Sequence, residues 1–287
     1  MINLGSINIK SSDKKKSTII GWGISLVLFI IAIIIYILSI KFTLLRNDGL
    51  FQYRAWNWME YFLGICSLVV ISIRFREIKL RTVICGLFFA FLCWISFFYR
   101  TTEIDTTIID GLITFLAYIA GCSLRNTENG VRSLANEGEF KNAVKSLLYG
   151  CIVSILFACI NVVYFVVTQD SIKLQNPLIS GFLALQPGIG EEIVFRFFII
   201  NATLTILRNK LSQKHLLFVV MFLGVIPHSI LHFPDLWLDN IPNAVFMLVS
   251  TSLMFGFPMA YIQYKRNLES AIGFHWFIDF FRFFVGF

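Results

Sequence analysis

The sequence predicts an all-α, polytopic membrane helical bundle with about eight or nine transmembrane helices. Two observations lead to this fold class. Residues of the set AVILMFWYC make up 57% of the 287 residues, and charged residues make up only 14%, whereas about a quarter of a soluble domain is charged. The mean hydropathy is +0.77. The chain therefore lacks the polar residues that a water-exposed surface needs, and this composition excludes extended soluble domains, collagen-like repeats and disorder.

Nine apolar runs are long enough to cross a bilayer, which takes about 20 residues of helix. The first, from Thr18 to Ile40, follows a lysine-rich segment and has no small-residue cleavage site, so we predict a retained span and not a signal peptide. The count falls to eight if one run is re-entrant or interfacial. The other runs lie near residues 57–73, 82–99, 107–124, 146–168, 179–207, 215–233, 242–264 and 268–286.

The basic residues predict the orientation of the chain. With the amino terminus in the cytoplasm, 17 of the 24 Lys and Arg residues fall in inside segments and 5 in outside segments, as the positive-inside rule requires. The net charge of +7 comes from these short clusters, so we predict no nucleic-acid partner. The six cysteines lie inside apolar runs without ligand spacing, which indicates buried hydrophobic residues and neither a disulfide framework nor a zinc site.

Ionisable residues inside the spans divide the chain into regions. A charged group at the bilayer centre costs at least about 2.5–3.5 kcal/mol, so it usually has a function or a partner. The amino-terminal half is nearly free of such residues, and Asp110 is the main exception. We predict a cytoplasmic leader at 1–16, spans without a recognised motif at 17–168, and a functional core at 179–287. The ionisable residues that stand out inside the spans of that core are Glu191, Glu192, Arg196, His228, His232, His275, Asp279 and Arg282.

The first polar cluster follows Pro187, Gly188 and Gly190, which favour a kink in the helix. Glu192 and Arg196 are four residues apart and therefore share a helix face, while Glu191 is rotated by roughly 100° toward another neighbour. A buried ion pair that only holds helices together explains Glu192 and Arg196. Two adjacent acids are more than such a pair requires, which favours a function.

Two further pairs have the same four-residue spacing, His228 with His232 and His275 with Asp279. Each pair places its polar groups on one helix face. A lone histidine in a span is more often a hydrogen-bonded packing residue, but a carboxylate beside an imidazole can fix its tautomer. Three helices that each contribute a polar face can enclose one internal site, and this combination predicts a catalytic centre.

These motifs resemble those of the CPBP family, the CAAX protease and bacteriocin-processing (Abi) proteins, which are intramembrane glutamic proteases. The family carries EExxxR, FxxxH and HxxxN/D in this order, and the chain has Glu191-Glu192-x-x-x-Arg196, His232, and His275-x-x-x-Asp279. The resemblance covers roughly residues 179–283. It implies that the carboxy-terminal core has the fold of the type II CAAX prenyl proteases.

The resemblance also implies a role for each motif residue. Glu191 would be the general base that activates water, assisted by the histidine of the second motif, and His275 with Asp279 would stabilise the oxyanion. Glu192 and Arg196 would hold the site together. The family has Phe four residues before the histidine of the second motif. This chain has His228 at that position if His232 is the catalytic histidine, and Gly224 at that position if His228 is the catalytic histidine. We therefore assign His232 as catalytic and His228 as supporting.

Three alternatives stay open. His228, His232, His275 and a glutamate have the ligand types of a zinc site, although the resemblance implies a metal-independent peptidase without a cofactor. A non-enzymatic membrane regulator, immunity protein or scaffold that binds a membrane partner is the second. A transporter is the third, and the absence of paired repeats argues against it.

The partners that we expect are the lipid bilayer and a membrane-associated peptide or protein substrate, with a regulatory membrane partner as a further candidate. Nothing in the sequence encodes recognition of a prenyl group. The resemblance implies a multi-pass protein of a bacterial plasma membrane and, in that setting, a peptide pheromone, bacteriocin or lipoprotein-like substrate.

Overall fold

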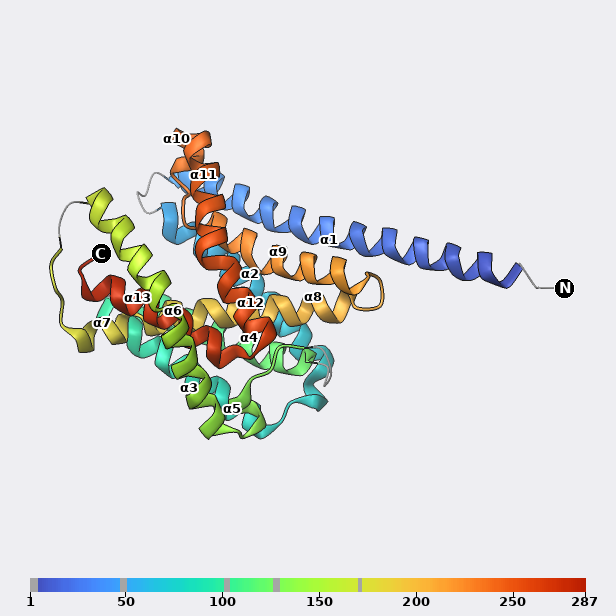
Figure 1. Cartoon of the computed structure of the whole chain (residues 1–287), viewed down its shortest axis with the longest axis horizontal. Coiled ribbons are helices and arrows are strands. Elements are labelled where there is room, and N and C mark those ends of the chain that lie inside the picture. Colours follow the sequence, from blue (N-terminus) through green and yellow to red (C-terminus); the bar gives the residue numbers. More distant parts are fainter. Residues whose placement is uncertain (1–4, 47–50, 101–103, 126–129, 170–171) are drawn as a thin grey trace.

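The computed structural model describes residues 5–46, 51–100, 104–125, 130–169 and 172–287. In these residues the chain forms helices and turns and no strand, which confirms the all-α prediction (Figure 1). The elements are α1 (Gly5–Arg46), α2 (Phe51–Arg74), η1 (Phe75–Glu77), α3 (Leu80–Arg100), α4 (Ile104–Leu124), α5 (Leu134–Glu137), α6 (Phe140–Gln169), α7 (Pro177–Leu183), η2 (Gln186–Phe198), α8 (Ile199–Leu207), α9 (Gln213–Ile230), α10 (Leu236–Asp239), α11 (Ile241–Thr251), η3 (Ser252–Gly256), α12 (Phe257–Lys265) and α13 (Leu268–Phe284).

Each predicted span has a helical counterpart. Two of the nine are composite, because α7, η2 and α8 follow one another through the predicted span 179–207, and α11, η3 and α12 through 242–264. Within the described residues, five helices are long and apolar enough to cross a membrane, and two shorter apolar helices accompany them. The chain is therefore an integral membrane protein with several spans.

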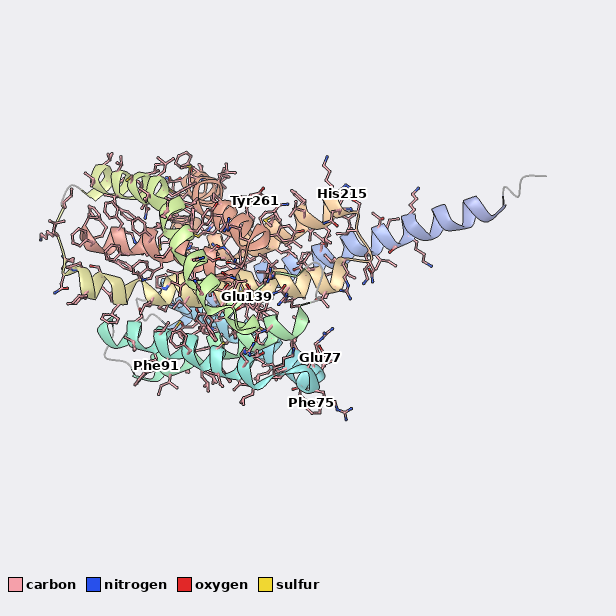
Figure 2. The ribbon with its side chains drawn as sticks, turned by 60° about the horizontal axis from the view of Figure 1, so that its bottom comes forward. Phe75, Glu77, Phe91, Glu139, His215 and Tyr261 are labelled. Carbon is pink, nitrogen blue, oxygen red and sulfur yellow. The ribbon has the colours of Figure 1, made fainter. Side chains whose placement is uncertain are left out.

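The outer surface of the bundle is apolar. Large hydrophobic side chains are exposed along α1, α3, α6 and α11, and Phe91 projects from the outer face of α3 (Figure 2). Such a wide exposed apolar surface is unfavourable in water and suits lipid. The end of α1 that carries the amino terminus extends beyond the other helices (Figure 1).

Helix α13, which carries the third motif, packs closely against α6 (Figure 1). A Cβ added at Gly273 of α13 would lie 2.0 Å from the carbonyl oxygen of Leu147 in α6, and one added at Gly150 of α6 would lie 2.1 Å from the carbonyl oxygen of Ser270. Only glycine lets the two backbones approach this closely, and small residues serve this purpose in many membrane bundles. These two glycines therefore fix the position of α13.

The start of α13 is held by polar contacts as well. Asn267 caps the helix by accepting a hydrogen bond from the backbone nitrogen of Ser270, as asparagine often does at this position. The buried carboxylate of Glu269 accepts hydrogen bonds from the hydroxyl of Ser133 and the backbone nitrogen of Ala135, at 2.9 and 3.0 Å. The segment that joins α4 to α6 thus docks on the first turn of α13.

The first motif lies in a π-helix and not in the kinked α-helix that we expected. Element η2 runs from Gln186 to Phe198, and all of its residues are buried. π-helical segments are rare and often occur at functional sites. Pro187 stands in its first turn, where the lack of an N–H group is tolerated. At Gly188 an added Cβ would lie 2.8 Å from the Cα of Trp276, so this glycine lets η2 approach α13.

Candidate active site

The seven predicted site residues come together in the interior of the bundle. Element η2 carries Glu191, Glu192 and Arg196, α9 carries His228, the turn after α9 carries His232, and α13 carries His275 and Asp279. Glu192 is completely buried, and Glu191 keeps 8% of its surface exposed. Segments that lie far apart in the sequence therefore enclose one polar centre, as the motif analysis predicts, and the chemical role of each residue stays a prediction.

His228 connects Glu191 to Arg196. Its Nδ1 lies 3.1 Å from a terminal nitrogen of Arg196, and its Nε2 lies 3.1 Å from Oε2 of Glu191. Because arginine has only hydrogen-bond donors, Nδ1 must accept, and the ring hydrogen is then on Nε2. His228 consequently donates to Glu191 and orients its carboxylate.

Carboxylates surround His275. Its Nδ1 lies 2.8 Å from Oε1 of Glu192, and its Nε2 lies 3.3 Å from Asp279 and 3.8 Å from Oε2 of Glu191. Arg196 also forms a close ion pair with Glu192. Both ring nitrogens of His275 face acceptors, so the geometry favours a ring that carries a hydrogen on each.

The charges of this centre can balance internally. Its three carboxylates, those of Glu191, Glu192 and Asp279, lie near two guanidinium groups, because Arg282 pairs with Asp279 at 3.0 Å. A doubly protonated His275 leaves these six groups without net charge. Buried charges need such pairing to offset their loss of hydration. Among the described side chains, Oε2 of Glu192 and Nε of Arg196 are still buried without a partner, and buried polar atoms of this kind are commonly satisfied by water.

His232 lies beside this network, and within the described part of the chain its ring forms no hydrogen bond with a carboxylate. One atom each of Glu191, His228 and His232 lie within 4.8 Å of one another. The His232 ring meets the His228 ring edge to face, with 5.0 Å between their centroids. Although His232 follows the end of α9, the turn at this helix end brings it back to the site.

Trp56 of α2 forms an aromatic wall of the site. Its ring is perpendicular to the rings of His228 and His232, with centroids 5.1 and 5.0 Å away. Phe195 of η2 stacks on His228 at 4.6 Å and meets the Trp56 ring edge to face, with 5.3 Å between their centroids. The amino-terminal spans, for which we recognise no motif, thus contribute directly to the site.

Sequence reasoning missed two residues near the centre, Trp56 and Glu60. Trp56 gives no sequence signal, since one tryptophan near the start of a span is common. Glu60 did give one: it is an acid inside the predicted span 57–73, so Asp110 is not the main exception that we expected. Glu60 is 6% exposed and hydrogen bonds to Asp110 through their side chains, and it lies near enough to Glu191 for electrostatic interaction.

Fold and site together define a class, a polytopic helical membrane protein with a buried centre of acids, histidines and arginines. A comparison with protein-family models then specifies it: residues 173–281 match the family described as type II CAAX prenyl endopeptidase Rce1-like. The match covers all three motifs and confirms the family resemblance inferred from them. No curated protein and no solved structure shows significant similarity to the chain.

Proposed function

We propose that this protein is an intramembrane peptidase that cleaves a membrane-associated peptide or protein with a water molecule activated by Glu191. The family match supports a CAAX-type membrane protease in general. The observation that carries the finer proposal is the contact of Glu191 with His228, with His275 nearby and Glu192 held separately by Arg196. One acid is therefore oriented for chemistry, while its neighbour belongs to the structural frame.

The nucleophile would be a water molecule between Glu191 and His232. Their side-chain atoms lie within 4.8 Å, a separation that one water molecule can bridge. Glu191 takes one proton from this water as the water oxygen attacks the carbonyl carbon of the substrate's peptide bond. Glu191 then passes this proton to the amine that leaves. His228 acts indirectly, because its Nε2–H holds the carboxylate of Glu191 in position.

His275 and Asp279 would stabilise the oxyanion. The imidazole of His275 is fixed by Glu192 at one nitrogen and by Asp279 at the other. Because both N–H groups of His275 already face carboxylates, the ring would act on the developing negative charge of the carbonyl oxygen through its own positive charge. A charge fixed in this way needs little reorganisation, and loss of one preorganised group at an oxyanion typically slows a reaction about 10²–10³-fold.

A zinc-dependent peptidase is the second candidate, because Glu191, His228 and His232 bring three ligand atoms together. The contact with Arg196 argues against it. Zinc on Nε2 of His228 would force the ring hydrogen onto Nδ1, where Arg196 already donates. Metal analysis of the purified protein, with chelation and addition of zinc, separates the two candidates: activity that a chelator removes and zinc restores supports the metal enzyme.

Comparative peptidomics tests the proposal. Membranes from cells with wild-type protein and with Glu191→Gln are compared, with Glu139→Gln as a control at a half-buried loop acid outside the site. We expect a precursor to accumulate only with Glu191→Gln, while both variants insert in equal amounts. Equal cleavage by wild type and Glu191→Gln excludes the glutamate mechanism. A phenotype that survives loss of both Glu191 and His275 points to a regulator or scaffold.

A further inference from the structure

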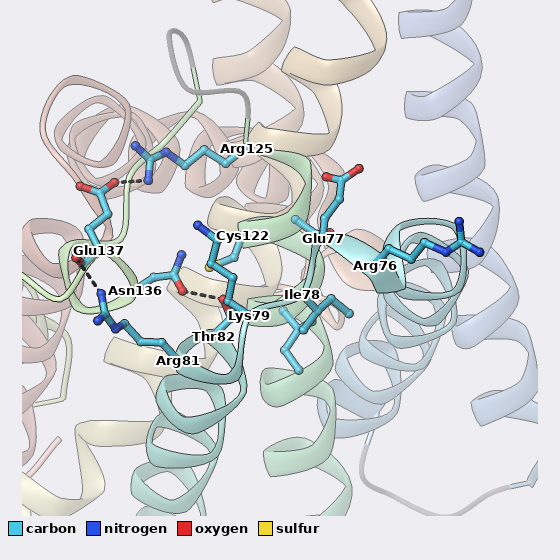
Figure 3. Close-up of a pocket in the computed structure, with 12 residues that line it drawn as sticks. Arg76, Glu77, Ile78, Lys79, Arg81, Thr82, Cys122, Arg125, Asn136 and Glu137 are labelled. Carbon is cyan, nitrogen blue, oxygen red and sulfur yellow. Dashed lines mark hydrogen bonds and ion pairs between the residues drawn. The ribbon is translucent and has the colours of Figure 1, made fainter.

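A cavity of about 920 Å³ lies away from the candidate active site. It opens between the turn that joins α2 to α3 and the segment after α4 (Figure 3). The positive-inside rule predicts that this end of the bundle faces the cytoplasm. The residues that line the cavity are Arg76, Glu77, Ile78, Lys79, Arg81, Thr82, Ile119, Cys122, Ser123, Arg125, Asn136 and Glu137.

The cavity has a surplus of positive charge. Both of its acids are engaged, since Glu77 pairs with Arg74 at 3.0 Å and Glu137 pairs with Arg125 and Arg132. Among the described residues, the other three lining cations, those of Arg76, Lys79 and Arg81, are in no ion pair. Arg81 donates to the backbone oxygen of Glu137 at 3.0 Å and keeps its charge uncompensated.

Exposed apolar side chains next to the cavity indicate a membrane surface. Ile73, Phe75 and Leu80 are 75%, 60% and 76% exposed, and Phe75 projects from the end of the bundle beside Glu77 (Figure 2). Large apolar residues this exposed are unfavourable in water and favourable among lipid chains. The cations therefore lie at the level where lipid headgroups begin.

We infer that this cavity binds a phosphate-bearing anion through Lys79 and Arg81, whereas the side chain of Arg76 extends away from them (Figure 3). Basic pockets at the cytoplasmic ends of transmembrane helices suit phosphorylated headgroups, and arginine forms paired hydrogen bonds to phosphate oxygens. Thr82 and Asn136, which hydrogen bond to each other at 2.6 Å, add neutral polar groups to the wall. The phosphate belongs either to an anionic lipid or to a free phosphate compound.

The test uses the full-length protein in two media and two double variants. The cavity variant is Lys79→Gln with Arg81→Gln, chosen because neither side chain is in an ion pair among the described residues. The control is Lys141→Gln with Lys145→Gln, which removes the same charge from exposed residues of α6 outside the cavity. Thermal unfolding and native mass spectrometry are measured in phosphatidylcholine with and without phosphatidylglycerol, and in phosphatidylcholine with inorganic phosphate.

We expect phosphatidylglycerol to bind and stabilise wild type and control. It should bind the cavity variant about thirtyfold more weakly, since each of the two cations contributes about 1 kcal/mol and about 1.4 kcal/mol corresponds to a factor of ten. If inorganic phosphate stabilises the wild-type protein, phosphatidylglycerol does not, and the effect is lost in the cavity variant, the site binds a free phosphate compound. Equal responses of the cavity variant and the control in every medium overturn the inference.

Discussion

A terminal nitrogen of Arg196 lies 3.1 Å from Nδ1 of His228, and this contact determines which ring nitrogen of His228 carries the hydrogen. Arg196 also pairs with Glu192. The guanidinium group of Arg196 thus connects two residues with different tasks. Glu192 belongs to the structural frame, and His228 orients the carboxylate of Glu191. Because an arginine side chain carries only hydrogen-bond donors, Arg196 sets the arrangement of protons on His228.

We predict that Arg196→Lys slows cleavage about 10–100-fold, the usual effect of removing a group that orients a reacting residue. Lysine keeps the charge but cannot donate to Glu192 and His228 with the same planar geometry. Nitrogen NMR of labelled histidine should show that His228 no longer has a single tautomer. Arg76→Lys, far from the site, is the control and should leave both measurements unchanged.

The two histidines of the second motif should respond differently to substitution. We expect His232→Gln to lower kcat with little change in KM, because His232 faces the attacking water in our proposal. His228→Gln should also lower kcat, and thermal unfolding should show reduced stability as well, because its ring connects Glu191 to Arg196. Full activity of His232→Gln would assign the catalytic histidine to His228.

Gly273→Ala should destabilise the bundle by about 1–3 kcal/mol or more, the range for overpacking. The added methyl group would collide with the backbone oxygen of Leu147. Thermal unfolding in detergent measures the effect, and Gly150→Ala should behave alike. The control is Gly23→Ala on α1, where an added Cβ has no atom within 4 Å. Equal melting temperatures for Gly273→Ala and Gly23→Ala would contradict the close approach of α6 and α13.

Trp56→Ala should reduce both stability and cleavage, whereas Trp56→Phe should retain most of each. Removal of a fully buried tryptophan costs about 3–5 kcal/mol, and we expect less here because Trp56 is partly exposed. Without the indole ring of Trp56, His228 and His232 each lose an aromatic contact. Trp58→Ala, which removes an exposed ring from the same helix, is the matched control for both the unfolding and the peptide assay.

Acid should loosen the segment 130–138. Burial raises the pKa of Glu137, but hydrogen bonds and charge from Arg132 and Arg125 outweigh this and hold the pKa below its ordinary value of 4.5. A lowered pKa in the folded state means that the stabilisation is present above pH 4.5 and is lost as the pH falls further. Hydrogen exchange of these amides should therefore accelerate in acid. Glu137→Gln should show fast exchange already at neutral pH, with less change on acidification.

The sequence predicts the transmembrane helices well, because each span is an apolar run of bilayer length bounded by polar residues. It predicts the convergence of Glu191, His228 and His275 only through the cost of burying charges and through the family motifs. The π-helix at Gln186–Phe198 could not be predicted, since proline and glycine indicate a break in the helix without its geometry. Trp56 could not be placed either, because its contacts depend on how α2 packs against η2 and α9. Glu60 needed only a closer inspection of its span.

The backbone contact between α6 and α13 also restricts how a substrate reaches the site. Gly150 and Gly273 bring these two helices together so closely that no side chain fits between them. A polypeptide arriving sideways from the lipid cannot pass through this side of the wall without separating the helices. Its path to Glu191 must therefore run through another opening, and cross-linking of a trapped substrate should label other helices before it labels this pair.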